Sequence, residues 1–167
     1  WDGTAKLWRL GGTVADGQDP RVREVATLAS HSDPVGAVAF SPDGNWALTG
    51  SWDNTAKLWR LERNGAGEQG RQVREVATLA GHSRDVTSVA FSPDGNWALT
   101  GSFDDTAKLW RMEGSGASAD DLQVRGVATL AGHSSIVSSV TVSPDGNWAL
   151  TGSSDNTAKL WRLERSD

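Results

Sequence analysis

The stretch that decides the fold is Ser41–Ser51, SPDGNWALTGS, because the same residues return at 92–102 and at 143–153. Each copy starts 51 residues after the previous one. The same interval separates the three histidines, His31, His82 and His133. Self-similarity at a fixed period of about 20–50 residues is the sequence signature of solenoids, propellers and other repeat folds. The chain is therefore expected to consist of copies of one structural unit.

Around this stretch the unit is expected to form four short strands. VGAVAF (35–40) is rich in β-branched and aromatic residues, which favour strands. It runs into Pro42-Asp43-Gly44, where proline presets the turn and glycine supplies a positive φ. A polar, glycine-rich segment at 62–72 is expected to be a loop. The expected strands of this unit are 35–40, 45–51, 55–61 and 73–80.

Composition excludes several classes of function. The 167 residues contain no cysteine, so disulfides, thiolate zinc sites and cysteine nucleophiles are excluded. The net charge of −5 lacks the positive field that nucleic acid or anionic lipid requires. No apolar run approaches the roughly 20 residues of a membrane span. We expect a cytoplasmic protein with no cofactor and no metal, and with neither nucleic acid nor membrane as a partner.

A histidine that opens the unit, followed by SPDG and then by TGSWDNTAKLW, resembles the WD repeat of β-propellers. This resemblance implies an all-β fold, a β-propeller of four-stranded antiparallel WD-type blades with about three blades per chain. It also implies that the first strand lines a central channel, and that the histidine loop and the aspartate turn share the top face. Two departures stand out: Ser30 replaces the glycine before His31, and arginine follows each third-strand tryptophan.

The repeat divides the chain into four parts, of which only the middle two are complete. Residues 1–30 are expected to hold the third and fourth strands of a blade, 31–81 and 82–132 to be whole repeats, and 133–167 an incomplete one. Propellers typically close with about 4–8 blades, so three blades leave open apolar faces.

Two explanations of the open faces compete. In the first, two copies of the chain give six blades or three copies give nine, and strand 22–29 completes the neighbour's last blade. Because the third strand is then present twice, either 1–10 or 157–163 is displaced. In the second, the chain is a piece of a longer protein that supplies the missing blades.

The resemblance further implies a buried polar tetrad in each unit: a histidine, a second-strand hydroxyl, the turn aspartate and the third-strand tryptophan. A buried imidazole can donate to the carboxylate and accept from the hydroxyl, which fixes one packing. An enzyme needs one site, so recurrence in three units indicates a structural role, and no catalytic residue is assigned. The tetrads are His31, Thr49, Asp53 and Trp59; His82, Thr100, Asp104 and Trp110; and His133, Thr151, Asp155 and Trp161.

Positions that vary against this uniform background are candidates for contact with a partner. The residue before the turn aspartate is Trp1, Trp52, Phe103 or Ser154, and tryptophan is enriched among interface hot spots. Local packing is the alternative for these aromatic residues. The loops after the histidines also vary, as expected of either a presented surface or a drifting loop. The candidate contacts are Trp1, Trp52, Phe103, Arg84, Asp85 and Asp33.

The sequence therefore favours a non-catalytic scaffold that presents top-face loops to protein partners and is closed by homo-oligomerisation. The alternative is a self-assembling structural module, either a naturally amplified array or an engineered fragment, with no ligand of its own.

Overall fold

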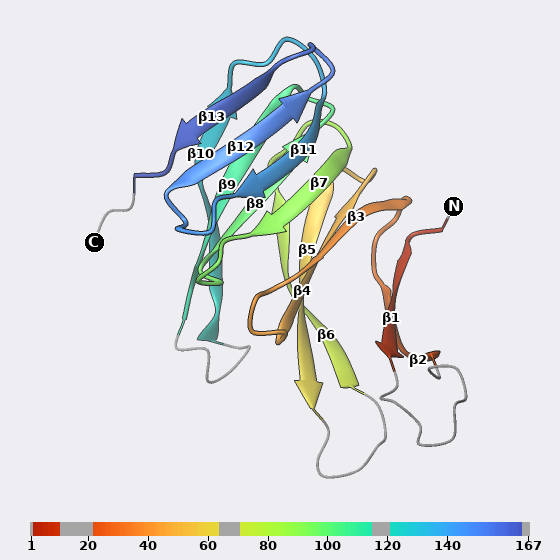
Figure 1. Ribbon diagram of the computed structural model, residues 1–167. Helices are drawn as coiled ribbons and strands as arrows, with labels where there is room; N and C mark the ends of the chain where they lie inside the picture. Colours follow the sequence, from red (N-terminus) through yellow and green to blue (C-terminus); the bar gives the residue numbers. More distant parts are fainter. Residues whose placement is uncertain (1, 11–21, 64–70, 115–120, 165–167) are drawn as a thin grey trace, which may run out of the picture.

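The computed structural model describes residues 2–10, 22–63, 71–114 and 121–164. Strands are the dominant structure of these residues, and Figure 1 shows them grouped into four sheets. In chain order the strands are β1 (Thr4–Leu10), β2 (Val22–Ala29), β3 (Val35–Phe40), β4 (Trp46–Ser51), β5 (Thr55–Arg63), β6 (Arg71–Ala80), β7 (Val86–Phe91), β8 (Trp97–Ser102), β9 (Thr106–Glu113), β10 (Gln123–Ala131), β11 (Val137–Val142), β12 (Trp148–Ser153) and β13 (Ala158–Arg162).

Each sheet is an antiparallel meander in which consecutive strands pair. Two sheets have four strands, β3-β4-β5-β6 and β7-β8-β9-β10, while β11-β12-β13 has three and β1-β2 has two. The first strands β3, β7 and β11 lie side by side, and the later strands extend outward from them (Figure 1). The expected all-β architecture of about three four-stranded blades is confirmed. Among the described residues, no helix is long and apolar enough to cross a membrane.

Turn chemistry sets the strand boundaries. Between β3 and β4, Gly44 adopts a φ of 67°, and its N–H donates to the Ser41 carbonyl over 2.9 Å. At the other end of β4, Asn54 adopts a φ of 68°, which asparagine tolerates better than most residues. Asp105 and Asn156 repeat this left-handed conformation one and two units later, at 67° each.

The expected loop at 62–72 is too long, and the structure corrects it. Glu62 pairs with Gln72 and Arg63 with Arg71, so β5 and β6 extend by two residues each beyond the expected strands. Polar composition misled the prediction, because the ladder is made by backbone groups and continues wherever the two chains stay in register. In the next unit β9 ends at Glu113 and β10 begins at Gln123.

The core lies between successive sheets. Leu48 and Leu58 pack against Val86 and Val89 of the following sheet, and all four side chains are buried. One unit later, Leu99 and Leu109 pack against Val137 and Val140 in the same way. The same leucine–valine junction therefore joins β3–β6 to β7–β10 and β7–β10 to β11–β13.

Candidate functional site

The best-defined polar constellation is the tetrad of the second complete unit. His82 Nδ1 lies 2.8 Å from Asp104 Oδ2, and His82 Nε2 lies 2.8 Å from Thr100 Oγ1. Trp110 Nε1 donates to the same Thr100 oxygen over 2.9 Å. Four elements contribute one residue each: the loop before β7, strand β8, the β8–β9 turn and strand β9. The structure thus brings together four residues that are spread over 29 positions of sequence.

The other two units repeat this geometry. His31 contacts Asp53 and Thr49 over 2.7 Å each, and Trp59 donates to Thr49 over 2.9 Å. In the last unit the corresponding distances are 2.8, 2.8 and 2.9 Å, and the residues are His133, Asp155, Thr151 and Trp161. In the described part of the first unit, Asp2 accepts from Thr4, and the Trp8 ring is exposed.

The proton positions follow from what each group can donate. An ionised carboxylate only accepts, so the imidazole carries its proton on Nδ1 and donates it to the aspartate. The threonine hydroxyl accepts the indole N–H and donates its single proton to Nε2, which is then an acceptor. Each tetrad is therefore a one-way chain from tryptophan through threonine and histidine to aspartate. Among the described residues, no buried side-chain nitrogen or oxygen lacks a hydrogen-bond partner.

The turn aspartate is held as an anion by several donors. Burial opposes ionisation of Asp104, but hydrogen bonds from Thr106, His82 and the Ser83 N–H outweigh it and lower the pKa to about 2. The Thr106 hydroxyl donates to Asp104 Oδ1 over 2.6 Å. The pKa of Asp155 is likewise lowered, first by its bond from Thr157. The carboxylate therefore stays charged at neutral pH and fixes the turn.

His82 is held in its neutral form. Burial lowers the pKa of His82 below its ordinary value, and the Asp104 carboxylate only partly offsets this. The side chains of all three tetrad histidines have no exposed surface. Both ring nitrogens are occupied by protein partners, so no face of the imidazole is available for a substrate. The arrangement can brace a blade, and it offers neither an accessible nucleophile nor an accessible base.

Sequence reasoning missed a fifth member of each constellation, the serine that ends the second strand. Ser102 is fully buried, donates to the Arg84 carbonyl over 2.9 Å and accepts the Asp104 N–H over 3.0 Å. It thereby ties the histidine loop to the aspartate turn. Ser51 and Ser153 make the same pair of bonds in their units. The signal was present, since this serine closes every copy of SPDGNWALTGS.

The candidate contact residues lie around the same end of the blades. Trp52 is 41% exposed on its turn, beside Gly36 of β3. Phe103 is half-buried because the Arg84 guanidinium lies over its ring, 5.7 Å from the centroid. Arg84 also donates to the Phe103 carbonyl over 3.2 Å. The third predicted aromatic contact, Trp1, lies outside the described residues.

The two acidic candidates differ in their surroundings. Asp33 is exposed, and its carboxylate accepts from the Ser32 hydroxyl over 3.0 Å. Asp85 is half-buried, and its carbonyl accepts the Phe103 N–H over 3.0 Å. The exposed group at this position of the loops is thus an anion in one blade and the Arg84 cation in the next.

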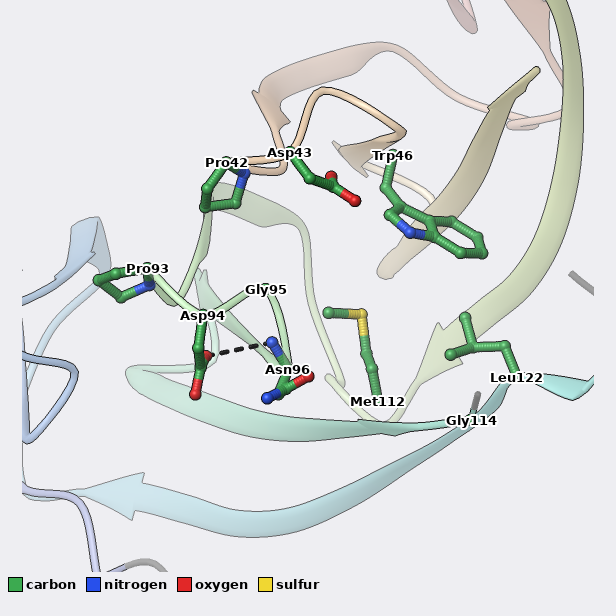
Figure 2. Close-up of a pocket in the computed structure, with 10 residues that line it drawn as sticks. All are labelled: Pro42, Asp43, Trp46, Pro93, Asp94, Gly95, Asn96, Met112, Gly114 and Leu122. Atoms are coloured by element: carbon green, nitrogen blue, oxygen red, sulfur yellow. Dashed lines mark hydrogen bonds between the residues drawn. The ribbon is translucent and has the colours of Figure 1, made fainter. Parts of the chain in front are cut away.

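A pocket of about 290 Å³ lies at the opposite end of the blades, between two neighbouring SPDG turns (Figure 2). Trp46, Met112 and Leu122 form its apolar wall, and Asp43 and Asp94 line its polar side. The two aspartates are engaged by their own turns: Asp43 accepts the Asn45 N–H over 3.0 Å, and Asp94 accepts the Asn96 N–H over 3.1 Å. These carboxylates therefore shape the turns that carry them.

Within the described ranges, no three histidine or acidic side chains are grouped so that they could hold a metal ion. The three tetrad histidines sit in separate blades, each with its own aspartate.

Comparisons with known proteins agree with this geometry. A family model described as "WD domain, G-beta repeat" matches residues 22–60, 73–111 and 125–162, together well over half of the chain. Each matched segment runs from the outer strand of one sheet through the three inner strands of the next. The family unit therefore straddles two blades.

Several curated proteins are similar over most of the chain. A ribosome biogenesis protein WDR12 homolog of Drosophila erecta is 33% identical over 98% of this chain and 37% of its own length. The small ribosomal subunit protein RACK1 of Caenorhabditis elegans is 31% identical, with 97% and 58% covered. Protein HIR1 of Yarrowia lipolytica is 28% identical, with 88% and 14% covered. The chain thus spans between about a seventh and three fifths of the length of these relatives.

Proposed function

Because this chain belongs to the family of WD40-repeat proteins, we propose that it is a non-catalytic scaffold that presents the loops and turns beside its tetrad histidines to protein partners. The observation that carries the proposal is that the turns after the second strands have the same backbone hydrogen bond in all three units but carry different side chains. The N–H groups of Trp52, Phe103 and Ser154 each donate over 3.0 Å to an equivalent carbonyl in the histidine loop of their own unit. The acceptors are the carbonyls of Pro34, Asp85 and Ile136. One frame therefore carries an indole, a phenyl ring and a hydroxyl in equivalent places.

Charge varies on the same surface in the same manner. Asp33 and Arg84 follow their histidines by two residues, and Ser135 stands at the third such position. Serine side chains hold all three loops, since the carbonyls of these residues accept from the hydroxyls of Ser51, Ser102 and Ser153. Rigid aromatic groups with charged neighbours are typical of binding hot spots and their rims.

The tetrads support a scaffold rather than an enzyme. Their histidines are buried and bonded at both nitrogens, so they hold the surface loops in place. A loop held this way loses little further freedom when a partner binds, which favours affinity. The relatives named for ribosome biogenesis and for a ribosomal subunit are consistent with work inside assemblies.

Closure of the propeller by copies of this chain is part of the proposal. Two copies supply six blades, which lies within the usual range of about 4–8. A second candidate function follows from the same feature: the chain serves only as a self-assembling structural module. The exposed apolar side chains of its first and last described blades favour association in either case.

Binding by variants separates the two candidates. The tagged full chain, Trp52→Ala, Phe103→Ala and Val127→Ala are compared for the proteins that they retain and for solution mass. Val127 is a matched control, because it is exposed to a similar extent on the outer strand β10. A scaffold retains a defined partner that both aromatic variants lose and Val127→Ala keeps, with the mass unchanged in all four. If the full chain and all three variants retain the same proteins, the scaffold proposal is contradicted. The self-assembling structural module is then the remaining candidate function.

A further inference from the structure

The last described blade exposes a face that both complete blades bury. Leu150 and Leu160 are 45% and 63% exposed. Leu48 and Leu58, which occupy the same places two units earlier, are both fully buried by the next sheet. Gly152 shows the same contrast at the backbone. An added Cβ at Gly101 would meet Val137 and Val140 at 2.9 Å, whereas at Gly152 it would meet only Ser139, at 3.7 Å. The face is therefore shaped for a sheet that carries two valines.

The first complete blade exposes the opposite half of such a junction. Val38 and Phe40 on β3 are 66% and 62% exposed, whereas Val89, one unit later, is buried. A cavity of about 450 Å³ lies beside β3 and β4, and β1 and Leu28 of β2 form its far wall. Apolar side chains dominate the lining, with Leu7, Val35 and Phe40 among them. In the complete blades, the two inner strands occupy the place equivalent to this cavity.

Two strands of the chain compete for the same position. Residues 4–10 and 157–163 both read TAKLWRL, so β1 and β13 are built from identical sequence. Strand β1 pairs with β2 in the register that β5 and β6 use, including the shift after the leucine. Strand β13, in contrast, pairs with β12 on one side only. Strand β2 can thus accept β13 with no change of any paired side chain.

Polar groups across the junction fix its register. Two hydrogen bonds join β7 to β11. The Val140 N–H donates to Ser88 Oγ over 3.1 Å, and the Thr87 hydroxyl donates to the Val137 carbonyl over 2.5 Å. One unit later, Ser138 and Ser139 on β11 are exposed. Ser138 Oγ lies 3.4 Å from the Gly152 carbonyl oxygen, as Thr87 Oγ1 lies 3.1 Å from the Gly101 carbonyl oxygen. The β11 hydroxyls are therefore placed as Thr87 and Ser88 are.

We propose that a second copy of this chain closes both faces as one junction: its β11-β12-β13 sheet enters the cavity beside β3, and its β13 replaces β1 as the partner of β2. Leu150 and Leu160 then pack on Val35 and Val38 of the other copy. The exposed serines of β11 bond to the backbone of β3 at those valines. This inference rests on the self-association in the proposed function and specifies its contacts.

A second copy fits better than an unrelated partner because the chain contains the finished junction twice. Both halves of that junction are present here, one at each open face. A head-to-tail contact of this kind closes into a ring when the rotation permits. With β1 displaced, two copies give six blades of four strands each.

One substitution tests the docking face. Gly152→Val adds methyl groups where the free chain is open. In the proposed junction they would meet Val35 and Val38 of the second copy, as a Cβ at the equivalent Gly50 would meet Val86 and Val89 at 2.8 and 3.0 Å. Gly126→Val is the matched control, because its Cβ would meet only the Trp110 ring at an ordinary 3.4 Å. We expect light scattering to give about twice 17.7 kDa for the unmodified chain and for Gly126→Val, and 17.7 kDa for Gly152→Val with unchanged circular dichroism.

The outcomes of this experiment distinguish the proposed junction from the proposed self-association and from partner binding. A Gly152→Val variant with the doubled mass overturns the junction but leaves self-association standing. A single-chain mass for the unmodified protein overturns both, and it leaves partner binding at Trp52 and Phe103 untouched.

A disulfide crosslink tests the strand exchange. Because the chain contains no cysteine, only the introduced cysteines can form it. Lys6 pairs with Thr27 in β1–β2, and Lys159 occupies the equivalent place on β13. The double variant Thr27→Cys with Lys159→Cys is expected to give a covalent dimer on a non-reducing gel. Thr27→Cys with Lys6→Cys is the control for an unexchanged β1. A disulfide within single chains of the control, with none between copies in the first variant, overturns the exchange.

Discussion

A Cβ added to Gly101 would lie 2.9 Å from Val137 Cγ1, so the second strand of one blade meets the first strand of the next at its backbone. The equivalent distance from Gly50 to Val86 Cγ1 is 2.8 Å. Glycine at this position lets adjacent sheets approach closely enough for the leucine–valine core to form.

Gly101→Ala is expected to destabilise the fold by about 1–3 kcal/mol, because the added methyl overpacks a junction that includes Val137 and Val140. Urea unfolding measures the loss. Gly126→Ala is the control, since its Cβ would meet the Trp110 ring at 3.4 Å. Equal unfolding midpoints for the two variants would show that the junction is not tightly packed.

Thr100→Val removes the hydroxyl that joins His82 to Trp110 and keeps the side-chain shape. Two buried groups then lose their partner, and we expect a loss of about 1–3 kcal/mol in unfolding free energy. Thr78→Val is the control, because its exposed hydroxyl bonds to Glu75 and Lys57 at the surface. A loss no larger than that of the control would contradict the bracing role of the tetrad.

Acid is expected to unfold the protein in two stages. The lowered pKa of His82 means that the unfolded chain binds its proton first, so stability falls as the pH drops below about 6.5. The pKa of Asp104, lowered to about 2, adds a second loss as the pH falls from about 4 toward 2. Urea midpoints at a series of pH values measure both stages. Asp104→Asn should flatten the second stage, and an unchanged slope there would refute this assignment.

Trp52→Ala is expected to change the unfolding free energy by no more than about 0.5 kcal/mol, because the ring is 41% exposed on a turn. Trp59→Ala makes the same chemical change at a buried site and should cost about 3–5 kcal/mol. Thermal melting of both variants provides the comparison. A loss above 1 kcal/mol at residue 52 would favour local packing over partner contact.

Local features could be predicted from the sequence. The strand at 35–40 and the turn at Gly44 depend on short-range patterns. The pairing of His82 with Asp104 was expected from the resemblance to WD repeats. The extension of β5 through Arg63 was not predictable from composition, because the hydrogen bonds between paired strands are made by backbone groups and do not depend on side-chain polarity. The bracing role of Ser102 was also missed: the repeat marks the serine itself, but its partners are a backbone carbonyl and a backbone N–H, which no side-chain pattern identifies.

The sequence by itself determined the repeat, and it determined the strand order because turn and strand preferences act over a few neighbouring residues. The tetrad residues followed from the resemblance of that repeat to WD repeats. Only the tertiary structure decided which of the identical side chains are buried. Leu48 and Leu150 occupy the same position in two copies of the eleven-residue segment SPDGNWALTGS, yet the first is fully buried and the second is 45% exposed. Burial of a sheet face depends on a second sheet lying against it, and no local sequence can state whether that sheet is there.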